Sequence, residues 1–220
     1  MKKYLTLLLV VILNSFLLCQ VELKGTMGIN FLSTPSLQDY INQIYAPSSA
    51  QLGSFNSAII FTGEAGKFLS KEIELSVEIP YQIYSYTENT LNGQYELSYN
   101  LFLPSAMAYY VIAGESYNFK LGFGAGLRLV AVTESKKWEG SERDLSSTGF
   151  GSLLRVEGNT LLAENLYANI GLDIRYDVNG EPEDNDGSKL RNTVQGEDVN
   201  FDTFSVGVKL GISYLIGGTD

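Results

Sequence analysis

The sequence predicts an all-β fold: an eight-stranded, antiparallel, up-and-down transmembrane β-barrel with one short helix in its first long loop. Apolar and polar residues alternate with a period of two over most of the 220 residues, which is the pattern of β-strands. The links between these segments are short and long in turn, as in a membrane barrel with tight turns on one side and loops on the other. An apolar leader at the N-terminus indicates export.

The first 19 residues have the composition of a secretory signal peptide. Lys2 and Lys3 precede an apolar run over residues 4–13, and bulky apolar residues follow at 16–18. A basic start and a short apolar core are typical of signal peptides, and the run is shorter than the roughly 20 residues that a membrane-spanning helix needs. We expect cleavage after Cys19, so that residues 1–19 are removed and residues 20–220 form one barrel domain. The alternative is a lipoprotein signal in which Cys19 is lipidated.

Eight segments after the leader show the alternation. Four are strict (73–82, 119–129, 166–178 and 203–216) and four are weaker (21–31, 55–64, 97–113 and 147–157). The short links are residues 65–70, 114–118 and 158–165, and the long links are residues 32–54, 87–94, 135–146 and 179–200. If the N-terminus is periplasmic, eight strands place every short link on the inner side and every long link outside.

The polar phase of the strands carries ionised groups rather than a uniformly solvated surface. Six basic and seven acidic residues occupy it: Glu22, Lys24, Glu64, Glu74, Glu78, Lys120, Arg128, Arg155, Glu157, Asp173, Arg175, Asp177 and Lys209. Such a nearly neutral set suits a narrow lumen, where isolated charges are too costly to bury. We expect a lumen charge network that includes Glu74, Glu78, Arg128, Arg155, Asp173, Arg175 and Lys209. The alternative is a soluble, lipocalin-like, periplasmic ligand-binding barrel with its apolar face inside.

At the level of architecture the chain resembles the small eight-stranded outer-membrane barrels of the OmpA, OmpX and OmpW types. The resemblance covers residues 21–216 and rests on the leader, the eight alternating segments and the asymmetry of the links, without a diagnostic motif. It implies a location in the outer membrane, contact with membrane lipid and lipopolysaccharide, and a monomer. Such barrels commonly end on an aromatic residue, whereas this chain ends on Thr219 and Asp220.

Composition excludes several kinds of function. The chain has no His and only one Cys, at position 19, which excludes imidazole and thiol chemistry in the mature protein. Its net charge of −10 argues against a nucleic-acid partner, which needs a basic surface. Enzymes among the small outer-membrane barrels rely on a catalytic histidine, so the resemblance implies a protein without catalytic residues or cofactors. We expect an envelope-structural or surface-interaction protein whose loops contact an extracellular protein.

A short helical pattern lies in the first long link. Thr34 is placed as an N-cap and Pro35 opens the helix. Leu37, Ile41, Ile44 and Tyr45 share one face, and Pro47 helps to end the helix. A lone helix of this length needs a surface to cover, so we expect it to lie across the outer mouth or against the inner wall. It could form the lid of a small ligand pocket.

Two prolines interrupt neighbouring strand segments. If the hairpin folds about residues 90–91, Pro80 pairs near residue 101, and Pro104 weakens the same patch of wall, because proline cannot donate to a ladder. A twist adjustment explains them simply. The functional alternative is a lateral opening at Pro80 and Pro104, which would make the barrel a narrow conduit or binding site for small apolar compounds.

The last long link is acidic. Asp184 and Asp186 match part of a calcium-binding loop, but the full motif would put its first and last ligands on Pro182 and Thr193. We therefore favour a solvated, mobile loop without a metal, and keep a weak calcium site as the alternative.

Overall fold

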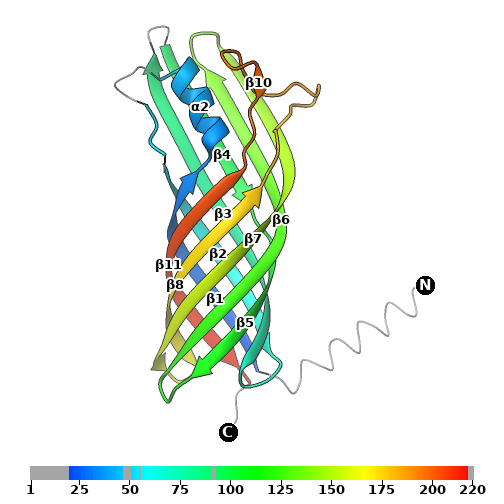
Figure 1. Ribbon diagram of the computed structural model, residues 1–220. Helices are drawn as coiled ribbons and strands as arrows, with labels where there is room; N and C mark the ends of the chain where they lie inside the picture. The colour runs from blue at the N-terminus through cyan, green and yellow to red at the C-terminus, as the bar shows by residue number, and fades with distance from the viewer. Residues whose placement is uncertain (1–19, 47–50, 55, 91–92, 218–220) are drawn as a thin grey trace, which may run out of the picture.

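The computed structural model describes residues 20–46, 51–54, 56–90 and 93–217, and within them one closed antiparallel barrel. The leader, including Cys19, and Pro47 lie outside these residues. The wall is built from β1 (Val21–Ser33), β2 (Asn56–Phe68), β3 (Ile73–Thr90), β4 (Gly93–Phe102), β5 (Ser105–Ala113), β6 (Tyr117–Lys136), β7 (Ser141–Ala163), β8 (Leu166–Val178) and β11 (Thr203–Ile216). β4 and β5 lie end to end between β3 and β6, so the ring has eight positions, as predicted (Figure 1).

Three further elements lie at one end of the barrel: α2 (Pro35–Ile44), β9 (Arg191–Asn192) and β10 (Glu197–Asp198). They gather at the end opposite the short turns and the last residues of β11 (Figure 1). Short turns face the periplasm in barrels of this type, so the end that carries α2 is the outer end. Among the described residues, no helix has the length and apolarity to cross a membrane.

The outer surface of the lower barrel is a continuous apolar belt. Side chains such as Val77, Phe123 and Leu210 are more than half exposed, whereas Asp173 and Lys209 are almost completely buried in the lumen. Because the strand period is two, one phase of each strand faces out and the other faces in. An apolar outside around a charged inside suits lipid, so the soluble lipocalin-like alternative is wrong.

The polarity of the wall reverses above this belt. On β3 the outward residues change from Ile83 to Ser85, Thr87 and Asn89. On β7 they change from Phe150 to Thr148 and then Asp144. On β4 the inward residues are apolar, including Leu97. The upper barrel therefore has the polarity of a water-soluble barrel, with polar residues outside and an apolar core inside.

This upper extension corrects two predicted loops. Residues 87–94 and 135–146 are mostly strand, because β3 pairs with β4 through Thr90 and Gly93, and β6 pairs with β7 through Lys136 and Ser141. Strand pairing continues there because it still buries an apolar inner face. The predicted short links are also shorter than expected, since β2 continues to Phe68 and β7 to Ala163.

The two prolines interrupt hydrogen bonding without a bulge. The register pairs Tyr81 with Phe102, so Pro80 lies opposite Leu103 rather than residue 101, and the Leu103 N–H donates to the Pro80 carbonyl at 3.0 Å. The pairing of β3 keeps one register on both sides of Pro104. The wall is therefore continuous in register, and the partner of Pro80 lies two residues further along the chain than predicted.

A matched pair of arginine substitutions on β3 tests the height of the belt. Val77→Arg places a charge on the lipid-facing surface and should lower the free energy of unfolding by about 2–4 kcal/mol. Thr87→Arg, on the same outward face above the belt, should change it by less than about 0.5 kcal/mol. Urea unfolding in lipid vesicles measures both values. Equal losses of stability in the two variants would mean that the upper edge of the belt does not lie between Val77 and Thr87.

Candidate functional site

Arg155 is the centre of an ion-pair cluster in the middle of the lumen. Its Nε lies 2.6 Å from Asp173 Oδ1, its Nη2 lies 2.6 Å from Glu78 Oε2, and its Nη1 lies 3.1 Å from Glu64 Oε2. The same guanidinium donates to the Tyr109 hydroxyl at 2.9 Å. All five side chains are buried, so each bond lies out of contact with bulk water.

The remaining members complete a balanced set. Asp173 Oδ2 lies 2.9 Å from Arg175 Nη2 and 2.7 Å from Lys209 Nζ. Lys24 Nζ lies 2.7 Å from Glu157 Oε2 and 3.4 Å from Glu64 Oε2. The cluster thus contains four carboxylates and four cations: Glu64, Glu78, Glu157, Asp173, Lys24, Arg155, Arg175 and Lys209. We call it the middle cluster.

Two smaller groups flank the middle cluster. Nearer the short turns, Lys120 contacts Glu22 and Glu74, the latter at 2.7 Å; we call these three residues the lower triad. Nearer the outer end, Arg128 contacts Asp177. Of the seven predicted network residues, the structure therefore brings five together in the middle cluster, whereas Glu74 and Arg128 belong to the flanking groups.

The lumen is filled by these side chains. An eight-stranded barrel is just wide enough for its own side chains, and here they are charged and mutually paired. Beside the break at Pro80 and Pro104, the inward residues Glu78, Leu103 and Ser105 are at most 2% exposed. The lumen next to the proposed lateral opening is thus occupied by protein.

An apolar core closes the outer mouth. From α2, Leu37, Tyr40 and Ile41 are buried against the inner face of the extension, which includes Leu97 and Val132. Of the predicted lid residues, Leu37 and Ile41 lie in this core, and Ile44 and Tyr45 pack partly buried against it. Thr34 makes no side-chain cap; its hydroxyl lies 3.0 Å from the Thr203 hydroxyl and ties the start of α2 to β11.

One carboxylate lies inside this apolar core. Glu134 Oε1 accepts hydrogen bonds from the Tyr40 hydroxyl at 2.5 Å and from the Tyr95 hydroxyl at 3.0 Å, and Tyr45 stacks on Tyr95 with ring centroids 3.7 Å apart. Burial and the adjacent Glu134 raise the pKa of both Tyr40 and Tyr95, so both phenols stay protonated and can donate. This group was not predicted from the sequence. The sequence feature that indicates it is Glu134, a single carboxylate two residues after Val132 in the same inward phase.

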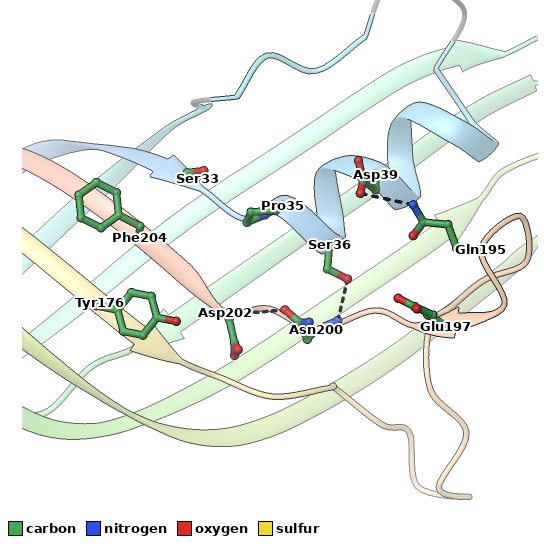
Figure 2. A pocket seen from close by; sticks show the side chains of 10 residues that line it. All are labelled: Ser33, Pro35, Ser36, Asp39, Tyr176, Gln195, Glu197, Asn200, Asp202 and Phe204. Atoms are coloured by element: carbon green, nitrogen blue, oxygen red, sulfur yellow. Dashed lines mark hydrogen bonds between the residues drawn. The ribbon is translucent and has the colours of Figure 1, made fainter.

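A depression of about 400 Å³ lies between α2 and the segment that leads into β11 (Figure 2). Three carboxylates line it, from Asp39, Glu197 and Asp202, and the exposed rings of Tyr176 and Phe204 lie at one end. The described residues that line it are Ser33, Pro35, Ser36, Asp39, Tyr176, Gln195, Glu197, Asn200, Asp202 and Phe204. None of them is Lys or Arg. Its chemistry therefore suits a cationic or hydroxyl-bearing group.

The predicted calcium residues are used differently. Asp184 Oδ2 accepts a hydrogen bond from Arg143 at 2.9 Å, and its Oδ1 accepts the backbone N–H groups of Asp186 and Ser188. The Arg143 hydrogen bond lowers the pKa of Asp184. Within the described residues, no group of three or more acidic or Cys side chains is placed to hold a metal ion.

The part of the protein above the belt is strongly acidic. It carries fourteen carboxylates and five basic side chains. The acidic residues are Asp39, Glu88, Glu96, Glu134, Glu139, Glu142, Asp144, Glu181, Glu183, Asp184, Asp186, Glu197, Asp198 and Asp202. The basic residues are Lys136, Lys137, Arg143, Lys189 and Arg191. We call this part, with α2, the acidic head.

Comparison with known proteins supports the fold. The structure of Ail from Yersinia pestis, in complex with the heparin analogue sucrose octasulfate, covers 91% of this chain and 100% of its own, with a TM-score of 0.53 and 10% identity. A major outer membrane protein of Thermus thermophilus covers 89% and 99% (TM-score 0.51, 13% identity). OprG from Pseudomonas aeruginosa covers 91% and 97% (TM-score 0.50, 11% identity).

No protein-family model and no curated protein matches the chain. At the identities of the solved structures, the likeness establishes the fold, which is that of the small outer-membrane β-barrels. The predicted fold class is confirmed. The fold and the apolar belt together place the protein in an outer membrane.

Proposed function

We propose that this outer-membrane β-barrel is a non-enzymatic surface-interaction protein, in which a closed barrel anchors a rigid acidic head that binds positively charged partners outside the cell. The observation that carries the proposal is the filling of the barrel by two successive cores, one ionic and one apolar. A barrel closed in this way has no continuous water path to offer a solute. Its accessible chemistry then lies on the acidic head.

The lumen supports a structural role for its carboxylates. Paired carboxylates can act as general acid and base when one is free to exchange protons with substrate. Here Glu78 is held by Arg155 and Arg175, and Glu74 by Lys120. Since the chain also lacks His, these groups are better explained as the polar interior of the barrel than as a catalytic site.

The charge of the head supports a cationic partner. Fourteen carboxylates against five basic groups create a negative potential that attracts cations and raises their association rate. Sucrose octasulfate, the ligand in the Ail structure, is a polyanion. We expect the opposite preference here, since polyanions would be repelled by the acidic head. The depression beside α2, with its carboxylates and exposed Tyr176 and Phe204, offers both charge and aromatic contact to an ammonium or guanidinium group.

Binding of model polyions to the full chain in lipid nanodiscs tests this function. We expect oligolysine to bind, with an affinity that falls as salt is added, and heparin not to bind. Asp39→Asn combined with Glu197→Gln should weaken oligolysine binding about two- to thirtyfold, by analogy with exposed ion pairs.

The matched control removes two charges at the other end of the barrel. Glu72→Gln combined with Glu115→Gln neutralises two carboxylates near the short turns and should leave oligolysine binding unchanged. Tight binding of heparin, or an equal loss in the control variant, would contradict a cation-binding head.

A further inference from the structure

The lower triad is the one ion-paired group of the described lumen whose charges do not balance. The middle cluster has four cations and four carboxylates, and Arg128 has Asp177. In the lower triad, one ammonium, that of Lys120, contacts two carboxylates, those of Glu22 and Glu74. With all three groups ionised, the triad would carry one uncompensated negative charge.

This excess charge is buried. Glu22, Glu74 and Lys120 are each at most 2% exposed. Glu22 Oε1 is buried and has no hydrogen-bond partner in the described part of the chain. An ionised carboxylate in such a site is strongly unfavourable, and buried groups usually neutralise instead.

Among the described residues, the nearest charged side chains do not supply a second cation. Lys24, from the same strand as Glu22, is held by Glu64 of β2 and Glu157 of β7. The Tyr109 ring of β5 lies 5.7 Å from Lys120 Nζ, and the Tyr109 hydroxyl is occupied by Arg155.

The other described elements offer only neutral side chains at this level. The inward residues of β8 and β11 nearest the lower end include Tyr167, Asn169 and Ser213. On β2, Lys67 belongs to the outward phase, because its neighbour Gly66 faces inward. The nearby charges therefore leave the imbalance of the triad in place.

We propose that Glu22 and Glu74 together bind one proton at neutral pH, so that the lower triad is neutral like the other ion-paired groups of the lumen. The proton comes from solvent when the chain folds and bonds to a carboxylate oxygen, and the second carboxylate remains paired with Lys120. A proton fits better than a metal cation because Glu22 Oε1 has almost no accessible surface, whereas a metal cation needs space and several oxygen ligands.

The proposal fixes the sign of a pH dependence. An unfolded Glu is ionised above about pH 5. The folded state then binds one more proton than the unfolded state, so the stability falls as the pH rises. A single proton corresponds to a change in the unfolding equilibrium constant of up to about tenfold per pH unit. Groups of the middle cluster that are ionised in both states contribute nothing between pH 5 and pH 7.

Urea unfolding of the full chain in lipid vesicles between pH 5 and pH 7 tests the proposal. Glu22→Gln and Glu74→Gln each imitate the protonated acid, so neither should raise the unfolding equilibrium constant at neutral pH above that of the parent protein. Each should also remove the pH dependence. The double variant leaves Lys120 unpaired and should raise the unfolding constant about a hundredfold or more.

Glu157→Gln is the matched control, because it makes the same change in the balanced middle cluster. It should raise the unfolding constant about a hundredfold or more while keeping the pH dependence. Infrared spectroscopy gives a second measurement, since the carbonyl stretch of a buried protonated carboxyl should be present in the parent protein and absent in the double variant.

Two results would overturn the proposal. One is that Glu22→Gln and Glu74→Gln each destabilise the barrel as much as Glu157→Gln, which would mean that both carboxylates are ionised. The other is a stability that rises with sodium or potassium at constant ionic strength and lacks the infrared band, which would assign the site to a metal cation.

Discussion

Replacing Arg155 with Met should abolish folding of the barrel or lower its free energy of unfolding by about 3–5 kcal/mol. Arg155 binds Asp173, Glu78 and Glu64 in the middle cluster, and its removal leaves four carboxylates for three cations. The loss comes mainly from stranding a charge away from water, and much less from the absence of one favourable contact. Urea unfolding in vesicles and the heat-dependent gel mobility of the barrel measure the effect.

A second substitution separates charge balance from packing. In the double variant with Arg155→Met and Glu64→Gln, three cations face three carboxylates, and each carboxylate retains a partner: Lys24 with Glu157, Arg175 with Glu78, and Lys209 with Asp173. The double variant should therefore recover part of the stability that the single variant loses.

An exposed ion pair of similar length provides the contrast. Lys189 and Glu181 lie 2.6 Å apart in the acidic head, with both side chains about a third or more exposed. Lys189→Met should cost far less than Arg155→Met, because water compensates the remaining carboxylate. If Arg155→Met cost no more than Lys189→Met, the lumen would have to be hydrated, and the closed barrel on which the proposed function rests would be wrong.

The placement of charged residues inside the barrel could be predicted because strand phase is a local property. Asp173 and Lys209 alternate with apolar neighbours, and a period of two assigns each residue to one face without knowledge of the partner strand. The partners could not be predicted in this way. Glu74 and Glu78 share a strand and a phase, yet one belongs to the lower triad and the other to the middle cluster.

Partner choice depends on the register between strands, which the sequence sets only through turns and long-range packing. The error of two residues in the pairing of Pro80 illustrates this limit. Such a slip keeps every side chain on its proper face, so the pattern of alternation gives no sign of it. It does move each inward residue to a different height, and thus to different neighbours.

The acidic head was only partly predictable for a different reason. Alternation identifies two faces but does not say which one meets lipid, and the prediction assumed one assignment for all strands. Leu97 and Tyr99 alternate with polar residues just as Leu172 and Ile174 do, but the first pair faces the core and the second faces lipid. The difference lies in the opposite phase, which holds Asp173, Arg175 and Asp177 on β8 but only one charged residue, Glu96, among Gln94, Ser98 and Asn100 on β4.

Leu97→Glu tests that reversal and should lower the free energy of unfolding by more than about 3 kcal/mol, because it places a second carboxylate in the apolar core that closes the mouth, directly opposite Glu134 of β6. Ser98→Glu, one residue later, points the same group outward and should change stability by less than about 0.5 kcal/mol. Urea unfolding compares the two, and trypsin sensitivity of the intact vesicles shows whether the head stays folded.

If the wall had the same polarity along its whole length, the two variants would rank in the opposite order of stability loss. If lipid reached Ser98, its replacement by Glu would cost about as much as a charge in the belt, and Leu97 would border a polar lumen that tolerates Glu. The stability losses at these two adjacent positions therefore show whether the membrane ends below them. They also decide whether α2 plugs a dry core, since Leu97 and Ile41 belong to the same buried cluster.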